Sequence, residues 1–170
     1  ADFARLLARC YFKLGEWQVA MNEEWVIDET YDVILSYKRA TELDRAWYKA
    51  WHAWALANFD VITHHERRGE AIPFHEVAAS IVPSVQGFFR SIALASGNSL
   101  QDTLRLLTLW FKFGHLEHVA DAVRQGFGTV SVDTWLGVIP QMIARISAPS
   151  ARVRRLIHHL LADVGVAHPQ

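Results

Sequence analysis

The stretch "DRAWYKAWHAWALANFD", residues 44–60, decides the fold through the spacing of its apolar residues. Trp47, Trp51 and Trp54 follow one another at intervals of four and three residues, so at about 100° per residue they form one stripe along a helix. An adjoining stripe consists of Tyr48, His52, Ala55 and Phe59. A helix carries so wide an apolar arc when neighbours cover it on two sides, as they cover an inner helix of stacked repeats. We therefore expect the tryptophans to pack in the core, in preference to forming an aromatic ligand cage.

The rest of the chain has the same helical periodicity of apolar residues. Apolar residues recur at three- and four-residue spacing nearly everywhere, whereas period-two alternation and Asn-Gly or Asp-Gly hairpin turns are absent. These patterns predict an all-α fold. The expected helices span about 2–14, 16–23, 29–42, 44–66, 75–95, 99–113, 115–127, 131–146 and 149–165.

Glycines mark the expected helix ends, because glycine adopts the left-handed conformation of a helix C-terminus at little cost. These glycines are Gly15, Gly69, Gly97, Gly114 and Gly128. One stretch, "THHERRGEAIPFHE" at residues 63–76, has the composition of an exposed linker, and we expect a loop near 66–75.

Three further residues indicate helix starts or kinks. Ser99 begins "SLQD", in which its side chain could cap a helix and Asp102 would lie at the positive end. Pro83 and Pro140 fall inside helical patterns. Each should kink its helix or mark its first turn, because proline lacks the N–H donor and clashes with the preceding turn.

A short internal sequence repeat indicates how the helices are arranged. "YFKLGEW" at 11–17 matches "WFKFGHL" at 110–116 as aromatic, Phe, Lys, apolar, Gly, and the two glycines lie 99 positions apart. This separation is about three units of the 34-residue helix-turn-helix repeat, whose signature also contains a Leu-Gly turn. We therefore predict an α-solenoid of stacked helix pairs, TPR- or HEAT-like, in preference to a closed four-helix bundle. Residues 1–170 would form a single helical-repeat unit.

Composition and charge argue against several classes of protein. The 170 residues carry a net charge of -1, with a pI near 6.8, which is too little positive charge for a nucleic-acid binder. We find no apolar stretch approaching the roughly 18 to 20 residues of a membrane span, and expect none.

The single cysteine, Cys10, cannot form an internal disulfide, which fits the cytoplasm, and we expect it to be buried. The helical start without an initiator Met indicates a piece of a larger protein.

A basic stripe runs along the first expected helix. Arg5, Arg9 and Lys13 stand at four-residue spacing, so they share one face. Two interpretations are open. The stripe could be a solvated face whose charges pair with neighbours. It could also be a polyanion site, in which Arg9 and Lys13 are joined by Lys49, which points away from the tryptophan stripe.

The sequence supports no catalytic or metal site. Nine histidines include His115 and His118 on one helix face, but no cysteine partner, HExxH motif or His-Asp dipeptide accompanies them. No GxSxG motif or Gly-rich phosphate loop occurs, and Asp44-Arg45 lacks the downstream residues of a kinase catalytic loop. We therefore expect no catalytic residue and no metal ligand within these residues.

Five blocks of the sequence, taken in order, are similar to one known family. They read "RCYFKLGEWQ", "RAWYKAWHAWALANF", "VPSVQGFFRSIALASGNSLQDTLRLLTLWFKFGH", "DTWLGVIPQMIARI" and "RLIHHLLADVGVAHPQ". Together they resemble the C-terminal part of the FAT domain of the target-of-rapamycin (TOR) kinases, over nearly the whole chain. "WYKAWHAWA" and "QGFFRSI" are distinctive of TOR within its kinase family.

The resemblance implies a scaffold with no catalytic residue of its own. TOR proteins are very large serine/threonine protein kinases of the phosphatidylinositol-3-kinase-related family, which act in nutrient signalling and growth control. Their FAT repeats form a curved clamp around the kinase domain. The chain would lie just before the rapamycin-binding segment and contain no kinase domain, with ATP and Mg bound only in the parent kinase domain. The implied partners are those two domains and the TOR complex subunits, in a dimeric cytoplasmic complex that can reach endomembrane surfaces.

The family also carries a FAT-domain pocket for inositol hexakisphosphate. The basic positions of its "RC-x-x-K-LGEW" and "WYKAWHAW" motifs correspond to Arg9, Lys13 and Lys49, so the resemblance favours the polyanion interpretation. Inositol hexakisphosphate would be a structural ligand, shared with basic residues outside 1–170. The alternative function is an independent TPR-like scaffold that binds peptides in its concave groove and folds stably alone.

Overall fold

The computed structural model describes residues 1–95, 99–145 and 162. Every regular element in this part of the chain is helical, which confirms the all-α prediction there. The elements are α1 (Asp2–Met21), α2 (Ile27–Leu43), α3 (Tyr48–Arg67), α4 (Phe74–Glu76), the π-helical η1 (Val77–Ile81), α5 (Val82–Leu94), α6 (Leu100–Phe113), α7 (Glu117–Phe127) and α8 (Val132–Arg145). The expected helix at 149–165 and Gly97 lie outside the described ranges.

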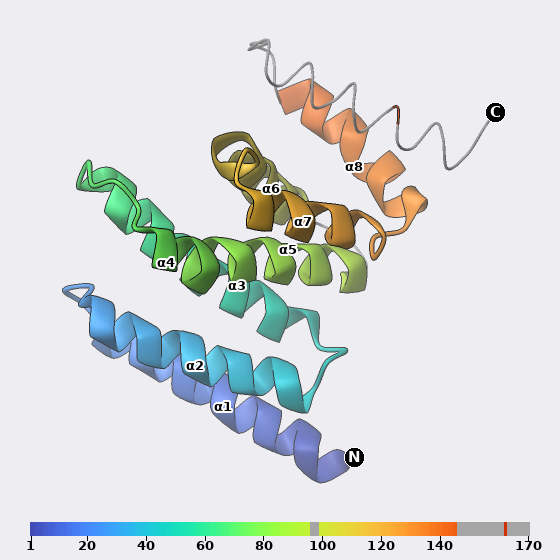
Figure 1. The fold of residues 1–170 in the computed structure, drawn as a ribbon. Coiled ribbons are helices and arrows are strands. Elements are labelled where there is room, and N and C mark those ends of the chain that lie inside the picture. Colours follow the sequence, from blue (N-terminus) through green and yellow to red (C-terminus); the bar gives the residue numbers. More distant parts are fainter. Residues whose placement is uncertain (96–98, 146–161, 163–170) are drawn as a thin grey trace.

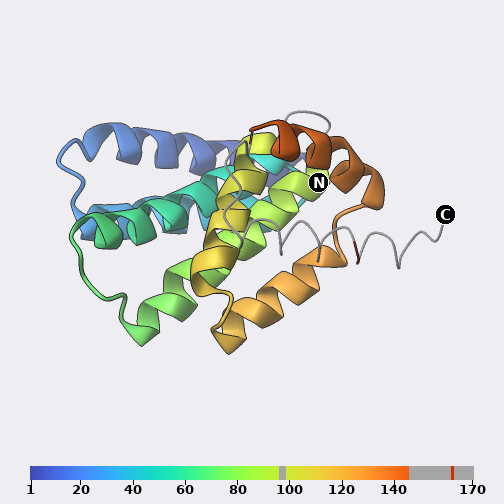
Figure 2. The same ribbon diagram turned by 90° about the horizontal axis from the view of Figure 1, so that it is seen from above.

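The helices stack in successive layers (Figure 1). α1 and α2 form the first layer, and α2 packs on α3. α3 lies against α5, whose other side is covered by α6 and α7, and α8 packs against α6. The helix axes change direction from one layer to the next (Figure 2). This order of contacts, in which each layer touches its neighbours, is that of a helical repeat.

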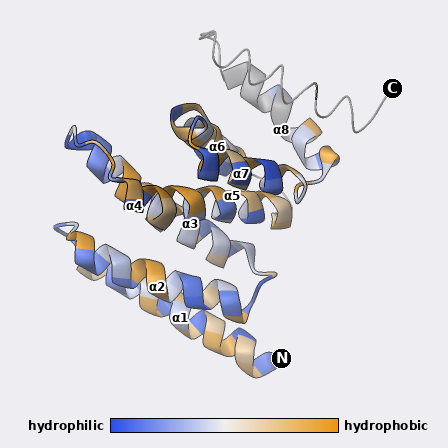
Figure 3. Cartoon of the chain, in the orientation of Figure 1, coloured by the Kyte–Doolittle hydropathy of each residue, from blue (hydrophilic) through white to orange (hydrophobic). Residues whose placement is uncertain are grey.

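α3 is the inner helix that the tryptophan stretch predicts. It lies between α2 and α5, and its side chains are buried on both sides. The larger apolar core joins α3, α5, α6 and α7 around Phe88, Phe89 and Leu106. Figure 3 shows the apolar residues along α4 and α5, in the middle of the stack. One boundary differs from the prediction, because α3 begins at Tyr48, so Trp47 precedes the helix.

The first helix is longer than expected. α1 continues through Gly15, so the predicted break between 2–14 and 16–23 is wrong. Gly15 is buried, and a Cβ atom built on it would lie 2.5 Å from Cε1 of Tyr37 in α2. Gly15 therefore permits a close approach of α1 to α2 and does not end a helix.

The same kind of contact recurs between α3 and α5 and between α5 and α7. A Cβ atom on Gly87 of α5 would lie 2.7 Å from Cβ of Ala55 in α3. A Cβ atom on Gly126 of α7 would overlap the ring of Phe89 in α5. At three helix pairs, α1–α2, α3–α5 and α5–α7, a glycine backbone is therefore part of the packing surface.

The glycine at the end of α3 does have the predicted conformation. Gly69 has a φ of 68°, in the left-handed region that favours glycine. Gly114 and Gly128 also follow helix ends, but with φ of -65° and -70° they remain right-handed, so the predicted left-handed ending is wrong at both. The loop after α3 comprises residues 68–73, because α3 ends at Arg67 and α4 begins at Phe74.

Pro83 lies in the first turn of α5, directly after the π-helical turn η1, where its missing N–H is tolerated. Ser99 occupies the N-cap position of α6 but makes no side-chain capping hydrogen bond, so that part of the prediction is wrong. Pro140 lies inside α8.

One segment is apolar enough to cross a membrane by length and composition. It spans Phe74–Leu94, which corrects the expectation that no apolar stretch reaches this length. More than half of its most apolar part is buried inside the fold. Its α5 portion packs against α3, α6 and α7, so here it is the central helix of the stack.

Candidate functional site

Arg9 ties α1 to the connection between α2 and α3. Its Nη1 atom lies 2.5 Å from Oδ2 of Asp44, and its Cζ atom lies 4.0 Å from the centroid of the Trp47 ring. Phe12, on the same helix, packs against Trp47 with ring centroids 4.8 Å apart. Asp44 directly follows α2 and Trp47 directly precedes α3. The guanidinium group is therefore held beside the start of α3.

Lys13 and Lys49 are both exposed, on different helices. Lys13 lies on α1 with its Nζ atom 3.0 Å from Oε2 of Glu16, in the next turn. Lys49 lies in the first turn of α3 and has no carboxylate within ion-pair distance among the residues that the structure describes. The structure thus brings Arg9 to Trp47 at the start of α3, two positions before Lys49 in the chain, while Lys13 follows Arg9 by one turn of α1.

Lys49 lies on the wall of a cavity of about 400 Å³. The cavity is bounded by α1 through Phe12, by α3 through Lys49 and His52, and by the end of α5 and start of α6. The first turns of α3 and α6 both line it, and the free N–H groups and dipole of a helix N-terminus favour negative charge. The cavity therefore offers room for an anion beside Lys49 and Phe12.

A buried carboxylate positions His52 at this wall. The Nδ1 atom of His52 lies 2.8 Å from both oxygens of Asp102, a residue that is only 7% exposed. The hydroxyl of Ser91 donates to Oδ2 of Asp102 at 2.8 Å, and Nη1 of Arg105 lies 3.3 Å from Oδ1. Side chains from α3, α5 and α6 thus share one carboxylate. The second ring nitrogen of His52, Nε2, makes no hydrogen bond to the residues that the structure describes.

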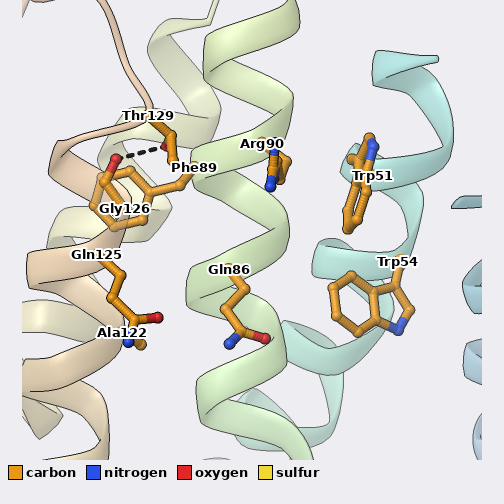
Figure 4. Close-up of a pocket in the computed structure, with 9 residues that line it drawn as sticks. All are labelled: Trp51, Trp54, Gln86, Phe89, Arg90, Ala122, Gln125, Gly126 and Thr129. Atoms are coloured by element: carbon orange, nitrogen blue, oxygen red, sulfur yellow. Dashed lines mark hydrogen bonds between the residues drawn. The ribbon is translucent and has the colours of Figure 1, made fainter. Parts of the chain in front are cut away.

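The tryptophans divide between the core and a second cavity. Trp54 is 9% exposed and packs edge to face on Trp51, with ring centroids 5.8 Å apart, as core packing predicts. Trp51 is half-buried and lies 5.8 Å from Cζ of Arg90. Both rings line a cavity of about 310 Å³ between α3, α5 and α7, with Gln86 and Gln125 on its other sides (Figure 4).

The remaining candidate side chains have structural surroundings. His65 is buried between two carboxylates, with Nδ1 3.3 Å from Glu70 and Nε2 2.8 Å from Glu76, so it joins α3 to the following loop and α4. Within the described ranges no group of three or more His, Cys, Asp and Glu residues could hold a metal ion. Cys10 is exposed, so its expected burial is wrong.

Sequence reasoning missed the acidic partners of the basic residues. Helical spacing places His52 on an apolar stripe, but His52 bonds Asp102, which lies 50 positions away. Asp44 bonds Arg9 over 35 positions. The spacing of nearby residues cannot predict contacts between residues so far apart in the sequence, because these contacts depend on which helices become neighbours in the stack.

Comparison with known proteins gives one family and a set of relatives. The FAT domain family matches residues 1–108. The chain is 48% identical over 164 residues to the serine/threonine-protein kinase tor1 of Schizosaccharomyces pombe, covering 96% of the chain and 7% of that protein. It is 38% identical over 201 residues to TOR2 of Saccharomyces cerevisiae, covering 99% of the chain and 8% of that protein. It is 42% identical over 183 residues to mTor of Drosophila melanogaster, covering 98% of the chain and 7% of that protein.

The chain therefore spans less than a tenth of the length of these curated relatives. It is similar to one segment of each, and the similarity extends past the residues that the FAT domain family matches.

Proposed function

Since the chain belongs to the FAT domain family, we propose that it is a scaffold segment that supports the kinase domain of a TOR-type serine/threonine protein kinase. We further propose that Arg9, Lys13 and Lys49 contribute to a pocket for inositol hexakisphosphate, together with basic residues outside this chain. Partners would be the rapamycin-binding and kinase domains of the longer chain and the subunits of its complex.

The observation that carries the polyphosphate proposal is the placement of the basic residues around the start of α3. Arg9 is held there by Asp44 and Trp47, and Lys49 lies in the first turn with no carboxylate beside it among the described residues. Guanidinium and ammonium groups from two helices can bind several phosphates at once. The residues present therefore fit a polyphosphate, although the carboxylates of Asp44 and Glu16 compete for two of the cations.

The proposed action is structural. Arg9 and Lys13 belong to α1, and Lys49 belongs to α3, so simultaneous binding joins the first layer of the stack to the inner helix. A ligand that binds only the folded state stabilises it by mass action. The scaffold would thus hold its shape around the kinase domain without contributing a reacting group.

Thermal unfolding of the complete FAT–kinase protein tests this proposal. At fixed salt, inositol hexakisphosphate should raise the unfolding temperature of the wild type. The Lys13→Glu/Lys49→Glu variant should show little or no rise, because two cations become anions. Equal shifts in both proteins would place the ligand elsewhere and return the basic stripe to the solvated-face interpretation.

A further inference from the structure

We propose that His52 is an additional ligand of the polyphosphate site, and that Asp102 is the residue that positions it. This inference rests on the proposed function, and it adds a histidine from the second turn of α3 to the three basic residues. Phosphate oxygens in the 400 Å³ cavity would accept a hydrogen bond from Nε2 of His52 while Lys49 binds the same group.

The first observation is the shared cavity. Lys49 and His52 are three positions apart on α3, so they lie on one face of the helix, and both line the cavity. An ammonium and an imidazole on adjacent turns can reach neighbouring oxygens of one phosphate group. Ser99, which is only 6% exposed, also lines the cavity, and its side chain makes no capping hydrogen bond to α6.

The second observation is the orientation of the imidazole. With Nδ1 2.8 Å from both Asp102 oxygens, the ring donates from Nδ1 to the carboxylate. Protonation then places a second N–H on Nε2, the nitrogen on the opposite side of the ring. Ser91 and Arg105 bind the same carboxylate and so keep Asp102 in place. Carboxylate–histidine pairs of this kind commonly fix a ring nitrogen toward a ligand.

The charged groups around His52 favour an anion. From its own helix it faces Lys49 and the phenol of Tyr48, from α6 it faces Asp102 with Arg105 beside it, and Phe12 of α1 and Ser91 and Ala95 of α5 are uncharged. Among the described residues that line the cavity, Asp102 carries the one carboxylate, and it is already bonded to Ser91 and Arg105. Lys49 therefore remains as a positive charge beside His52.

The affinity of the complete FAT–kinase protein for inositol hexakisphosphate, measured at fixed salt and fixed pH, tests the inference. His52→Gln removes the imidazole that Asp102 orients but keeps a hydrogen-bonding side chain. It should weaken binding about tenfold, the range expected for the loss of one charge-assisted hydrogen bond. The matched control is His75→Gln, at a side chain that is 78% exposed and outside the cavity, and it should bind like wild type.

A second variant does not depend on the His52–Asp102 bond. Gln101 is exposed in the first turn of α6 and lines the cavity. Gln101→Glu places a carboxylate on the cavity wall and should weaken binding. The substitution is favourable for the helix, since acidic residues stabilise a first turn, so lost binding would not reflect lost folding. Gln125→Glu, on the other cavity, is the matched control and should keep wild-type affinity.

The outcomes separate the two proposals. If wild type and Lys13→Glu/Lys49→Glu bind the ligand equally, the proposed function fails. If that variant loses binding while His52→Gln and Gln101→Glu bind like wild type, the basic residues form the site and the role of His52 is overturned.

Discussion

At Gly87 the backbone of α5 comes into contact with α3. A methyl group there would meet Cβ of Ala55 at 2.7 Å and the Trp54 ring at 3.1 Å, so the two helices would have to separate. Gly87→Ala should lower the free energy of unfolding by about 1–3 kcal/mol, the range for overpacking a buried site. Urea unfolding of the 170-residue chain, followed by circular dichroism at low concentration, measures this change.

Gly137 provides the control for that substitution. It also lies in a helix, α8, but a Cβ atom there would have no neighbour within 4 Å among the described residues. Gly137→Ala should be neutral or stabilising by up to about 1 kcal/mol, because alanine favours the helix. A similar loss of stability in both variants would contradict the close-contact explanation.

Tyr37 should make stability depend on pH in the alkaline range. Burial, and secondarily the carboxylate of Glu16, raises the pKa of Tyr37 to about 12 from an ordinary value of 10.0. Because the folded state holds this proton more tightly, the contribution is full below pH 10 and is lost as the pH rises toward 12. Urea unfolding above pH 10 should show an added slope of up to about 1.4 kcal/mol per pH unit.

Replacement of the phenol tests this origin of the slope. Tyr37→Phe should remove the added slope, since no proton is then exchanged at that position. Tyr48→Phe, at a side chain that is 43% exposed, should retain it. An unchanged slope in Tyr37→Phe would assign the pH dependence to other groups.

At the scale of single residues, the sequence predicts exposure and charge better than partners. The exposure of Lys49 follows from its angle to the tryptophans. The role of Gly15 could not be predicted. A glycine that permits close packing and a glycine that ends a helix look alike in the sequence, and only the position of Tyr37 in the structure distinguishes the two roles.

Among the elements, the connection between α2 and α3 controls how Arg9 is presented. Asp44 lies 2.5 Å from Arg9, and its side chain is only 12% exposed, so a polyphosphate must displace or share this carboxylate. Asp44→Asn removes the competing charge and should raise the affinity for inositol hexakisphosphate several-fold. Arg9→Ala should lower it about tenfold, as expected for one charge-assisted contact.

Calorimetric titration of the complete FAT–kinase protein measures both effects. Asp121→Asn is the control, because Asp121 pairs with Arg124 on α7, away from α1. It should leave the affinity unchanged. If Asp44→Asn weakens binding as much as Arg9→Ala does, then Asp44 serves the site by holding Arg9 in place and does not compete with the ligand.

Element boundaries could be predicted where periodicity and glycine agree. The inner position of α3 follows from its wide apolar arc, and the loop after Arg67 follows from its polar composition and Gly69. The π-helical turn η1 could not be predicted, because its apolar residues are equally compatible with an ordinary α-helix.

At the scale of the whole molecule, α1 leaves an apolar stripe exposed. Its members are Phe3 at 75%, Leu6 at 62%, Trp17 at 61% and Met21 at 82% exposure. Large exposed apolar patches associate in water. The isolated 170-residue chain should therefore show association that increases with concentration in sedimentation experiments.

Phe3→Ser/Trp17→Ser should reduce this association, whereas Phe74→Ser, at an equally exposed side chain on α4, should not. An independent scaffold would instead remain a stable monomer. The sequence predicts the helical stack through its apolar periodicity and its internal sequence repeat. It cannot indicate which apolar side chains remain exposed to solvent, because helical spacing is the same on covered and uncovered faces.

The glycine contacts between layers have a mechanical consequence. Where a backbone rests directly on the neighbouring helix, no long side chain can change rotamer to absorb a displacement, and close-packed interiors compress little. Gly87 places such a contact between α5 and Ala55 of α3, whereas at Gly15 and Gly126 the helix backbone rests on the rings of Tyr37 and Phe89. A displacement of α3 would therefore be passed to α5 as a movement of the whole helix, so this pair should behave as one stiff unit.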